Sequence, residues 1–252
     1  DIFAYYAAKA SDLGGTVKAS SSDNTRLYTV NEPVGVAGLV TPWNYPIAIP
    51  AWKIAPALAT GNTIVFKPAS QAPGVSRKLV ECLDEAELPD GVLNYVTGPG
   101  SEVGKTFSTH EAVDAVSFTG SSAVGDTVGR QANETGKRVQ LEMGGKNPTV
   151  VMPSADVDEA VDIAVSGAFG VTGQACTATS RAIVHEDIYD EFVEGAVAAA
   201  DAVEIGPGLD GAEMGPQVSE SELDSTLEYV DIGADEGATL ETGGDEVAAG
   251  RG

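Results

Sequence analysis

Cys176 is the side chain of this sequence best placed for covalent chemistry. It lies in a segment of small residues, 173–180, just before a predicted strand, where a thiol is exposed enough to act as a nucleophile. A buried structural thiol is the alternative, and it is the favoured interpretation of Cys82, which lies inside a helical pattern. Glu142 is a carboxylate in a comparable place, at the end of another predicted strand and before two glycines.

Asn44 lies between two aromatic residues in a segment whose backbone is fixed by Pro42 and Pro46. A side-chain amide held rigidly in this way can donate a hydrogen bond to a developing oxyanion. The alternative is an Asx-turn that caps the following helix. For this segment taken alone, the Asx-turn is the favoured interpretation.

Residues that suit a nucleotide follow several predicted strands. Lys67 ends one strand, where its ammonium can hold ribose hydroxyls or phosphate, although a lone surface lysine is the alternative. Glycines at 98–104 and 120–125 lie where a strand turns into a helix, and free N–H groups at a helix N-terminus suit a pyrophosphate. Neither spacing matches the G-x-G-x-x-G fingerprint.

The elements that must position these residues follow an alternating pattern. Repeated strand–helix–strand units predict an α/β fold with a Rossmann-like parallel sheet, right-handed crossovers and helices on its faces. Ligands bind beyond the carboxyl ends of such strands. The predicted strands are 34–40, 63–66, 92–96, 115–118 and 138–141, and the predicted helices are 48–59, 74–86, 101–108 and 122–133.

A second set of elements begins after Gly144 and Gly145, with strands at 149–152 and 181–184 and helices at 156–169 and 188–203. We therefore expect a dinucleotide-binding domain at 1–143, including a projecting β-hairpin at 15–31, and an incomplete α/β domain that carries Cys176 at 144–252. The end from residue 243 is predicted to be a loop. The sequence does not start with Met, and we expect it to be part of a longer chain.

The composition excludes several functions. The chain has 14 Lys and Arg against 38 Asp and Glu, a net charge of −24, which disfavours nucleic acid as a partner because like charges repel. The acidic residues are spread along the chain, and we interpret them as an adaptation to high salt, where dissolved ions screen the repulsion between like charges. No stretch is apolar for long enough to span a membrane.

Two cysteines and two histidines, none of them clustered, disfavour a zinc site or any other metal centre built from these residues. Both histidines lie beside acidic residues in segments typical of a protein surface, which also disfavours a Ser-His-Asp triad. Two cysteines could form at most one disulfide, which is not the disulfide framework of a secreted protein, so we expect a reducing, cytoplasmic location.

Five motifs in the same order make the sequence resemble the aldehyde dehydrogenase superfamily. The resemblance covers essentially all 252 residues, which look like the middle of a family chain without its downstream Glu-x-Phe-Gly-Pro segment. The motifs are Thr41-Pro42-Trp43-Asn44-Tyr45-Pro46, Phe66-Lys67-Pro68-Ala69-Ser70, Phe118-Thr119-Gly120-Ser121, Leu141-Glu142-Met143-Gly144-Gly145-Lys146 and Gly173-Gln174-Ala175-Cys176.

The resemblance implies catalytic roles for three residues. The Cys176 thiolate attacks the aldehyde carbonyl to form a thiohemiacetal, and hydride loss to a nicotinamide then leaves a thioester. The Asn44 amide and the Cys176 backbone N–H hold the oxyanion. Glu142 is the general base that activates water for hydrolysis.

The resemblance also implies NADP or NAD as the cofactor. Family members restricted to NAD tend to carry Glu at the position of Ser70, and a neutral side chain beside Lys67 should accept the 2′-phosphate of NADP. The implied cofactor-binding residues are Trp43, Lys67, Ser70, Gly100, Gly104, Gly120, Ser121, Gly125 and Gly144.

The motifs look most like those of dehydrogenases of 2-oxoglutarate semialdehyde (2,5-dioxopentanoate), with succinate semialdehyde dehydrogenases as close neighbours. Arg181 is a candidate clamp for an anionic substrate, although a structural ion pair is the favoured role. Three competing functions are an enzyme that passes the acyl group to CoA, a thiol hydrolase without a nucleotide, and a segment that binds nucleotide without catalysis. The hairpin resembles the arm that joins family homodimers or homotetramers.

Overall fold

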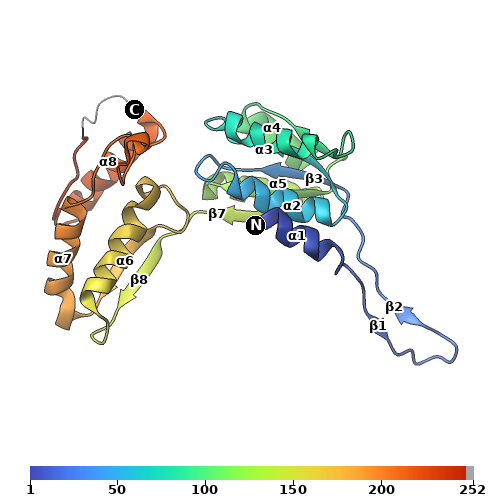
Figure 1. The fold of residues 1–252 in the computed structure, drawn as a ribbon, viewed down its shortest axis with the longest axis horizontal. Helices are drawn as coiled ribbons and strands as arrows, with labels where there is room; N and C mark the ends of the chain where they lie inside the picture. Colours follow the sequence, from blue (N-terminus) through green and yellow to red (C-terminus); the bar gives the residue numbers. More distant parts are fainter. Residues whose placement is uncertain (248–252) are drawn as a thin grey trace. The chain divides into compact units, whose positions relative to one another are not determined.

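The computed structural model describes residues 1–247; residues 248–252, the end of the predicted C-terminal loop, lie outside the described residues. The chain forms two compact units, Asp1–Gly144 and a second that begins at Gly145. The helices and strands of both are drawn in Figure 1. Within the described part of the chain, no helix is long and apolar enough to cross a membrane.

A five-stranded parallel sheet forms the centre of the first unit, which confirms the predicted α/β class. The strand order is β5-β4-β3-β6-β7, so the direction of strand addition reverses between β3 and β6. The strands are β3 (Val36–Val40), β4 (Thr63–Lys67), β5 (Leu93–Tyr95), β6 (Ala115–Gly120) and β7 (Arg138–Met143), and all five were expected from the sequence.

Helices cover both faces of this sheet, because alternate residues of its β-branched strands point to opposite sides. Ile64 and Phe66 of β4 pack with Ile54 of the helix that follows β3, whereas Val116 and Phe118 of β6 pack in a second cluster. The four covering helices are α2 (Ala48–Ala59), α3 (Pro73–Glu85), α4 (Gly100–Thr109) and α5 (Ser122–Glu134), close to their predicted bounds.

An N-terminal helix and a hairpin precede the sheet. Helix α1 (Ile2–Ala10), which the sequence analysis did not predict, packs on α2 and places Phe3 against the core cluster of Ile54 and Phe66. Strands β1 (Val17–Lys18) and β2 (Leu27–Tyr28) pair antiparallel, and the hairpin projects away from the sheet of this unit (Figure 1). Its Val17 and Tyr28 side chains are 84% and 70% exposed.

The second unit contains two parallel strands, β8 (Asn147–Val151) and β9 (Thr179–Val184), joined through α6 (Val157–Phe169). Helix α7 (Tyr189–Asp201) adds Phe192 to a core that contains Val151, Val161 and Ala164. These elements match the predicted pattern. Helix α8 (Glu220–Asp235), which the sequence analysis did not predict, has no buried residue.

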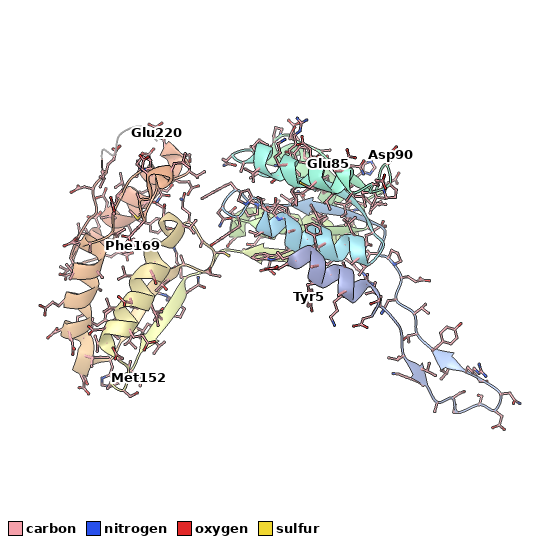
Figure 2. All side chains as sticks on the ribbon, in the orientation of Figure 1. Tyr5, Glu85, Asp90, Met152, Phe169 and Glu220 are labelled. Atoms are coloured by element: carbon pink, nitrogen blue, oxygen red, sulfur yellow. The ribbon has the colours of Figure 1, made fainter. Side chains whose placement is uncertain are left out.

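The prediction that Cys82 is a buried thiol is wrong, because Cys82 is exposed. Leu79, Val80 and Leu83 of α3 pack against the core, and the helical period carries residue 82 to the edge of that apolar face. Acidic residues are exposed in this part of the unit: Figure 2 shows Glu85 at the end of α3 and Asp90 in the loop that follows.

Candidate active site

The predicted site residues of the first unit follow the carboxyl ends of its parallel strands, which lie at one edge of the sheet. The loops after β3 and β6 flank the point where the strand order reverses, which is where open α/β sheets bind ligands. Asn44 follows β3, Lys67 ends β4, Ser121 follows β6 and Glu142 is near the end of β7. The topology therefore gathers these four residues at one edge.

Glu142 is exposed and is held by a neighbour on its own strand. Gln140 lies two residues earlier on the same face of β7, and its Nε2 donates a hydrogen bond of 2.8 Å to Glu142 Oε1. The Gln140 carbonyl oxygen accepts from Lys53 Nζ at 3.1 Å and also from the hydroxyl of Ser117. Lys53 Nζ donates to Ser117 Oγ at 2.7 Å. A continuous hydrogen-bonded network thus runs from Lys53 to Glu142.

Lys53 is a buried cation, with only 8% of the residue exposed. Burial lowers the pKa of Lys53 from 10.5 to about 8, while the Glu142 carboxylate acts in the opposite direction. Lys53 was not among the site residues expected from the sequence, although its position on the helix carried a signal. Ile49, Pro50 and Ile54 are buried on α2, and Lys53 falls within this otherwise apolar stripe.

The loop that carries Trp43 and Asn44 is tied to both neighbouring elements. Thr41 N donates to Lys67 O at 3.2 Å, which extends the pairing of β3 with β4. The buried Ser76 hydroxyl of α3 donates to Pro46 O at 2.9 Å. Trp43 and Asn44 are both half-buried between these two attachment points. The loop is therefore a rigid support of the kind that an oxyanion donor needs.

Lys67 is 4% exposed, which rules out the alternative of a lone surface lysine. Its Nζ donates to Pro68 O at 2.8 Å, and burial lowers its pKa. Ser70 is exposed in the loop that follows. The end of β4 thus places an ammonium and a small neutral hydroxyl near each other in the chain.

The glycine turns place two helix N-termini after parallel strands. In neither α4 nor α5 does the structure show a side-chain hydrogen bond from the capping residue, Pro99 and Ser121 respectively. The first-turn N–H groups of these helices can therefore bind an anion, which fits the phosphates of a dinucleotide. The Glu102 carboxylate in the first turn of α4 would repel a bound anion, and the first turn of α5 has no acidic residue. The N-terminus of α5 is therefore the better anion site.

The candidate glycines fall into two groups. A Cβ added to Gly125 would lie 2.4 Å from Met143 Sδ, and one added to Gly120 would lie 2.6 Å from the Phe118 ring. Gly125 permits close packing of α5 on the sheet, whereas Gly120 leaves room for the Phe118 ring of its own strand. A Cβ at Gly100, Gly104 or Gly144 would meet nothing within 4 Å; Gly100 and Gly144 are exposed, whereas Gly104 is buried.

Cys176 belongs to the second unit, and its thiol is free and exposed, as the nucleophile interpretation requires. The carboxamide of Asn147, the first residue of β8, holds the backbone at Cys176 and just after it. Its Nδ2 donates to Cys176 O at 2.8 Å and to Ala178 O at 3.0 Å. Asn147 was not among the site residues expected from the sequence, because its partners lie about 30 residues away.

Arg181 has a partner other than the ion pair favoured from the sequence. Its Nη2 donates to Lys146 O at 2.8 Å, so it ties β9 to the start of β8. Lys146 Nζ in turn lies 5.5 Å from the centre of the Tyr229 ring of α8, within the range of a cation–π interaction.

Comparison with known proteins places this site in context. The model of the aldehyde dehydrogenase family matches residues 1–252. The chain is 66% identical over 244 residues to an alpha-ketoglutarate semialdehyde dehydrogenase of Haloferax volcanii, covering 97% of this chain and 50% of that protein. It is 46% identical over 246 residues to a 2,5-dioxopentanoate dehydrogenase of Saccharolobus solfataricus, covering 97% of this chain and 52% of that protein.

A solved structure is also similar. The betaine aldehyde dehydrogenase of Staphylococcus aureus in complex with NAD+ superimposes with a TM-score of 0.95 at 39% identity, covering 98% of this chain and 49% of that chain. The chain therefore spans about half the length of the relatives it matches.

Proposed function

Because the chain belongs to the aldehyde dehydrogenase family, we propose that it forms the nucleotide-binding and nucleophile-bearing part of an enzyme that oxidises an aldehyde to a carboxylic acid. In this proposal residues 1–143 bind the dinucleotide and residues 144–252 supply Cys176. The observation that carries the proposal is the exposed Cys176 thiol, whose loop is fixed by Asn147.

Three residues divide the chemistry between them. The Cys176 thiolate attacks the aldehyde carbonyl to form a thiohemiacetal, while the Asn44 amide and the Cys176 backbone N–H hold the oxyanion. A bound nicotinamide nucleotide supplies the hydride acceptor that oxidises this adduct to a thioester. Glu142 then takes a proton from water, which attacks the thioester and releases the acid and the thiol. The Gln140 amide keeps the Glu142 carboxylate oriented for this step.

The first-unit residues fit a dinucleotide. The N-terminus of α5 and the exposed backbone of Gly100 and Gly144 suit its phosphates and close approach, and the buried Lys67 suits its ribose or 2′-phosphate. We propose NADP as the preferred nucleotide, with NAD also accepted, because Ser70 is exposed and neutral. Measuring kcat/KM for both nucleotides tests this preference, and a strong preference for NAD would reject it.

We propose 2-oxoglutarate semialdehyde as the substrate, with succinate semialdehyde as the second candidate. The names of the relatives from Haloferax volcanii and Saccharolobus solfataricus support the first. The test is the absorbance of NADPH at 340 nm with a panel of aldehydes. We expect the highest kcat/KM with 2-oxoglutarate semialdehyde, whereas activity confined to uncharged aldehydes would overturn the assignment.

The same assay separates catalysis from binding alone. It should be run on the full-length protein and on residues 1–252 by themselves. Turnover by the full-length protein alone would show that residues outside this chain are needed for catalysis. Nucleotide binding without turnover in both would support the alternative of a non-catalytic nucleotide-binding protein.

Two further properties are proposed from the surface. The hairpin exposes Val17 and Tyr28, and we propose that it pairs with another copy of the chain in a homodimer or homotetramer. The net charge of −24 supports adaptation to high salt. Light scattering tests the first property. Melting in low and in molar KCl tests the second, and we expect a higher Tm in molar KCl.

A further inference from the structure

The turn that precedes Cys176 contains two residues in a backbone conformation that is unfavourable for their side chains. Val171 has φ 54° and ψ 30°, and Thr172 has φ 59° and ψ 34°, within the short helical turn η1 (Gly170–Gly173). Both residues are β-branched, and this left-handed region is strongly disfavoured for such side chains. Strain of this kind persists only when the surrounding structure holds it in place.

A distant segment supplies the contacts that hold the turn. We name residues Gly215–Val218 the clamp segment. Thr172 Oγ1 donates to Gly215 O at 3.1 Å, which fixes one of the two strained residues directly. The carboxamide of Gln174 forms two more hydrogen bonds with the clamp segment. Its Nε2 donates to Pro216 O at 3.5 Å, and its Oε1 accepts from Val218 N at 2.9 Å.

Gln174 also stabilises the turn itself. Its Nε2 donates to Val171 O at 3.3 Å, and its backbone N donates to the same oxygen at 3.0 Å. One side chain therefore links the strained turn to the clamp segment. Gln174 precedes Cys176 by two residues, so its position constrains the backbone that carries the thiol.

The clamp segment is itself anchored at both ends. Before it, Met214 forms a β-bridge with Ile205, and Gly206 N donates to Met214 O at 3.0 Å. After it, Ser219 caps α8 by accepting a hydrogen bond from Glu222 N at 3.3 Å. Figure 2 labels Phe169, at the end of α6 beside the turn, and Glu220, at the start of α8 beyond the clamp segment. The contacts on the turn thus come from a fixed part of this unit.

We propose that Thr172 and Gln174, through the clamp segment, are positioning residues that fix the backbone of Cys176. Asn147 holds the other side of the same loop through Cys176 O and Ala178 O. The Cys176 N–H, which the proposed function assigns to the oxyanion, lies between these two attachments. This inference rests on the proposed function for the role of Cys176, but the clamp can be measured without any activity.

The first test is hydrogen exchange of backbone amides in the full-length protein. Thr172→Val keeps the shape of the side chain and removes its hydroxyl, whereas Thr172→Ser keeps the hydroxyl. We expect Thr172→Val to exchange at least about tenfold faster over residues 170–178, and Thr172→Ser to match the wild type. Thr226→Val is the matched control, because Thr226 Oγ1 bonds only within α8, to Glu222 O at 2.9 Å, in the contacts the structure gives.

The second test separates kcat from KM. Gln174→Ala should lower kcat by about ten- to a hundredfold, because small displacements of a reacting group have effects of this size. The KM for the nucleotide should stay within about twofold, since the proposed nucleotide-binding residues belong to the first unit. Gln174→Glu keeps only the acceptor for Val218 N and should show an intermediate kcat.

Three outcomes would overturn the proposal or its premise. Wild-type exchange and kcat in both Thr172→Val and Gln174→Ala would overturn the clamp. Faster exchange across α6 and α7 together with the loop, with a lowered Tm, would also overturn it, by showing a general structural role. Turnover retained by Cys176→Ala would instead overturn the proposed function, and the exchange measurement would still decide whether the clamp holds the loop.

Discussion

The surroundings of Glu142 and of Cys176 show two different ways to fix a reactive group. Glu142 lies on a strand of a five-stranded sheet and is held by side chains, through Gln140 to the buried Lys53. Cys176 lies in an irregular loop and is held through its backbone, by the Asn147 carboxamide on one side. The first arrangement contains a buried charge, whereas the second consists of neutral hydrogen bonds.

This difference predicts different sensitivities. A network that contains a buried ammonium responds to pH and to removal of charge, because desolvation and the attraction to a carboxylate oppose each other. A loop held by neutral donors responds instead to loss of an amide or a hydroxyl, with little dependence on pH. The variants below test whether the two regions differ in this way, from the largest expected effect to the smallest.

Cys176→Ala removes the proposed nucleophile and should lower kcat by at least about ten-thousandfold, because the thiol that would carry the thioester is gone. The steady-state rate of NADPH formation measures this loss. Cys82→Ala is the control, because Cys82 is also free and exposed but lies on α3. Equal losses in both variants would contradict the assignment of Cys176.

Glu142→Gln should lower the steady-state rate by roughly a hundred- to ten-thousandfold, because a positioned general base contributes about that much. Formation of the thioester does not need this carboxylate in the proposed mechanism. Rapid mixing should therefore show a burst of NADPH close to one equivalent per active site, followed by slow turnover. Loss of the burst would show that Glu142 acts before hydrolysis.

Lys53→Met should reveal the buried charge in the pH dependence of stability. Burial lowers the pKa of Lys53 from 10.5 to about 8, so between these pH values the unfolded state binds more protons than the folded state. The wild type should therefore gain stability relative to Lys53→Met as pH rises from about 8 to about 10.5, by up to about 3 kcal/mol.

Urea unfolding of both proteins at several pH values gives this difference in the free energy of unfolding. The comparison with the variant cancels the titration of other groups. A difference that stays constant, or that falls as pH rises, would show that Lys53 is not desolvated in the folded state.

Gln140→Met breaks the link between Lys53 and Glu142 while keeping a side chain of similar size. We expect kcat to fall by about tenfold, the value of one hydrogen bond to a charged group, and its pH profile to shift. Gln131→Met on α5 is the control and should leave kcat unchanged. A loss of the same size in both variants would exclude a specific role for Gln140.

The elements of the sheet could be predicted from the sequence because their signals are local. β-Branched runs such as 63–66 mark strands, and Gly61 and Gly136, both with positive φ, mark the ends of helices. Helix α8 was missed although its sequence carried two signals. Leu223, Leu227 and Val230 recur at helical spacing and are half-buried. Ser219 and Glu222 have the spacing of a capping box.

The contacts that position the reactive groups could not be predicted in the same way. Ser117 and Gln140 meet because β6 and β7 pair in the register that sets them opposite each other, and Lys53 reaches both from α2. Thr172 meets Gly215 more than 40 residues away. Such partners depend on strand register and on long-range packing, which the spacing of residue types does not specify.

The central claim is that Cys176 carries the acyl group, and mass spectrometry of the trapped adduct tests it most directly. The Glu142→Gln variant of the full-length protein, mixed with 2-oxoglutarate semialdehyde and NADP and quenched in acid, should yield a peptide acylated at Cys176, with Cys82 unmodified. An unmodified Cys176 during the NADPH burst, or an acyl group on any other residue, would contradict the account.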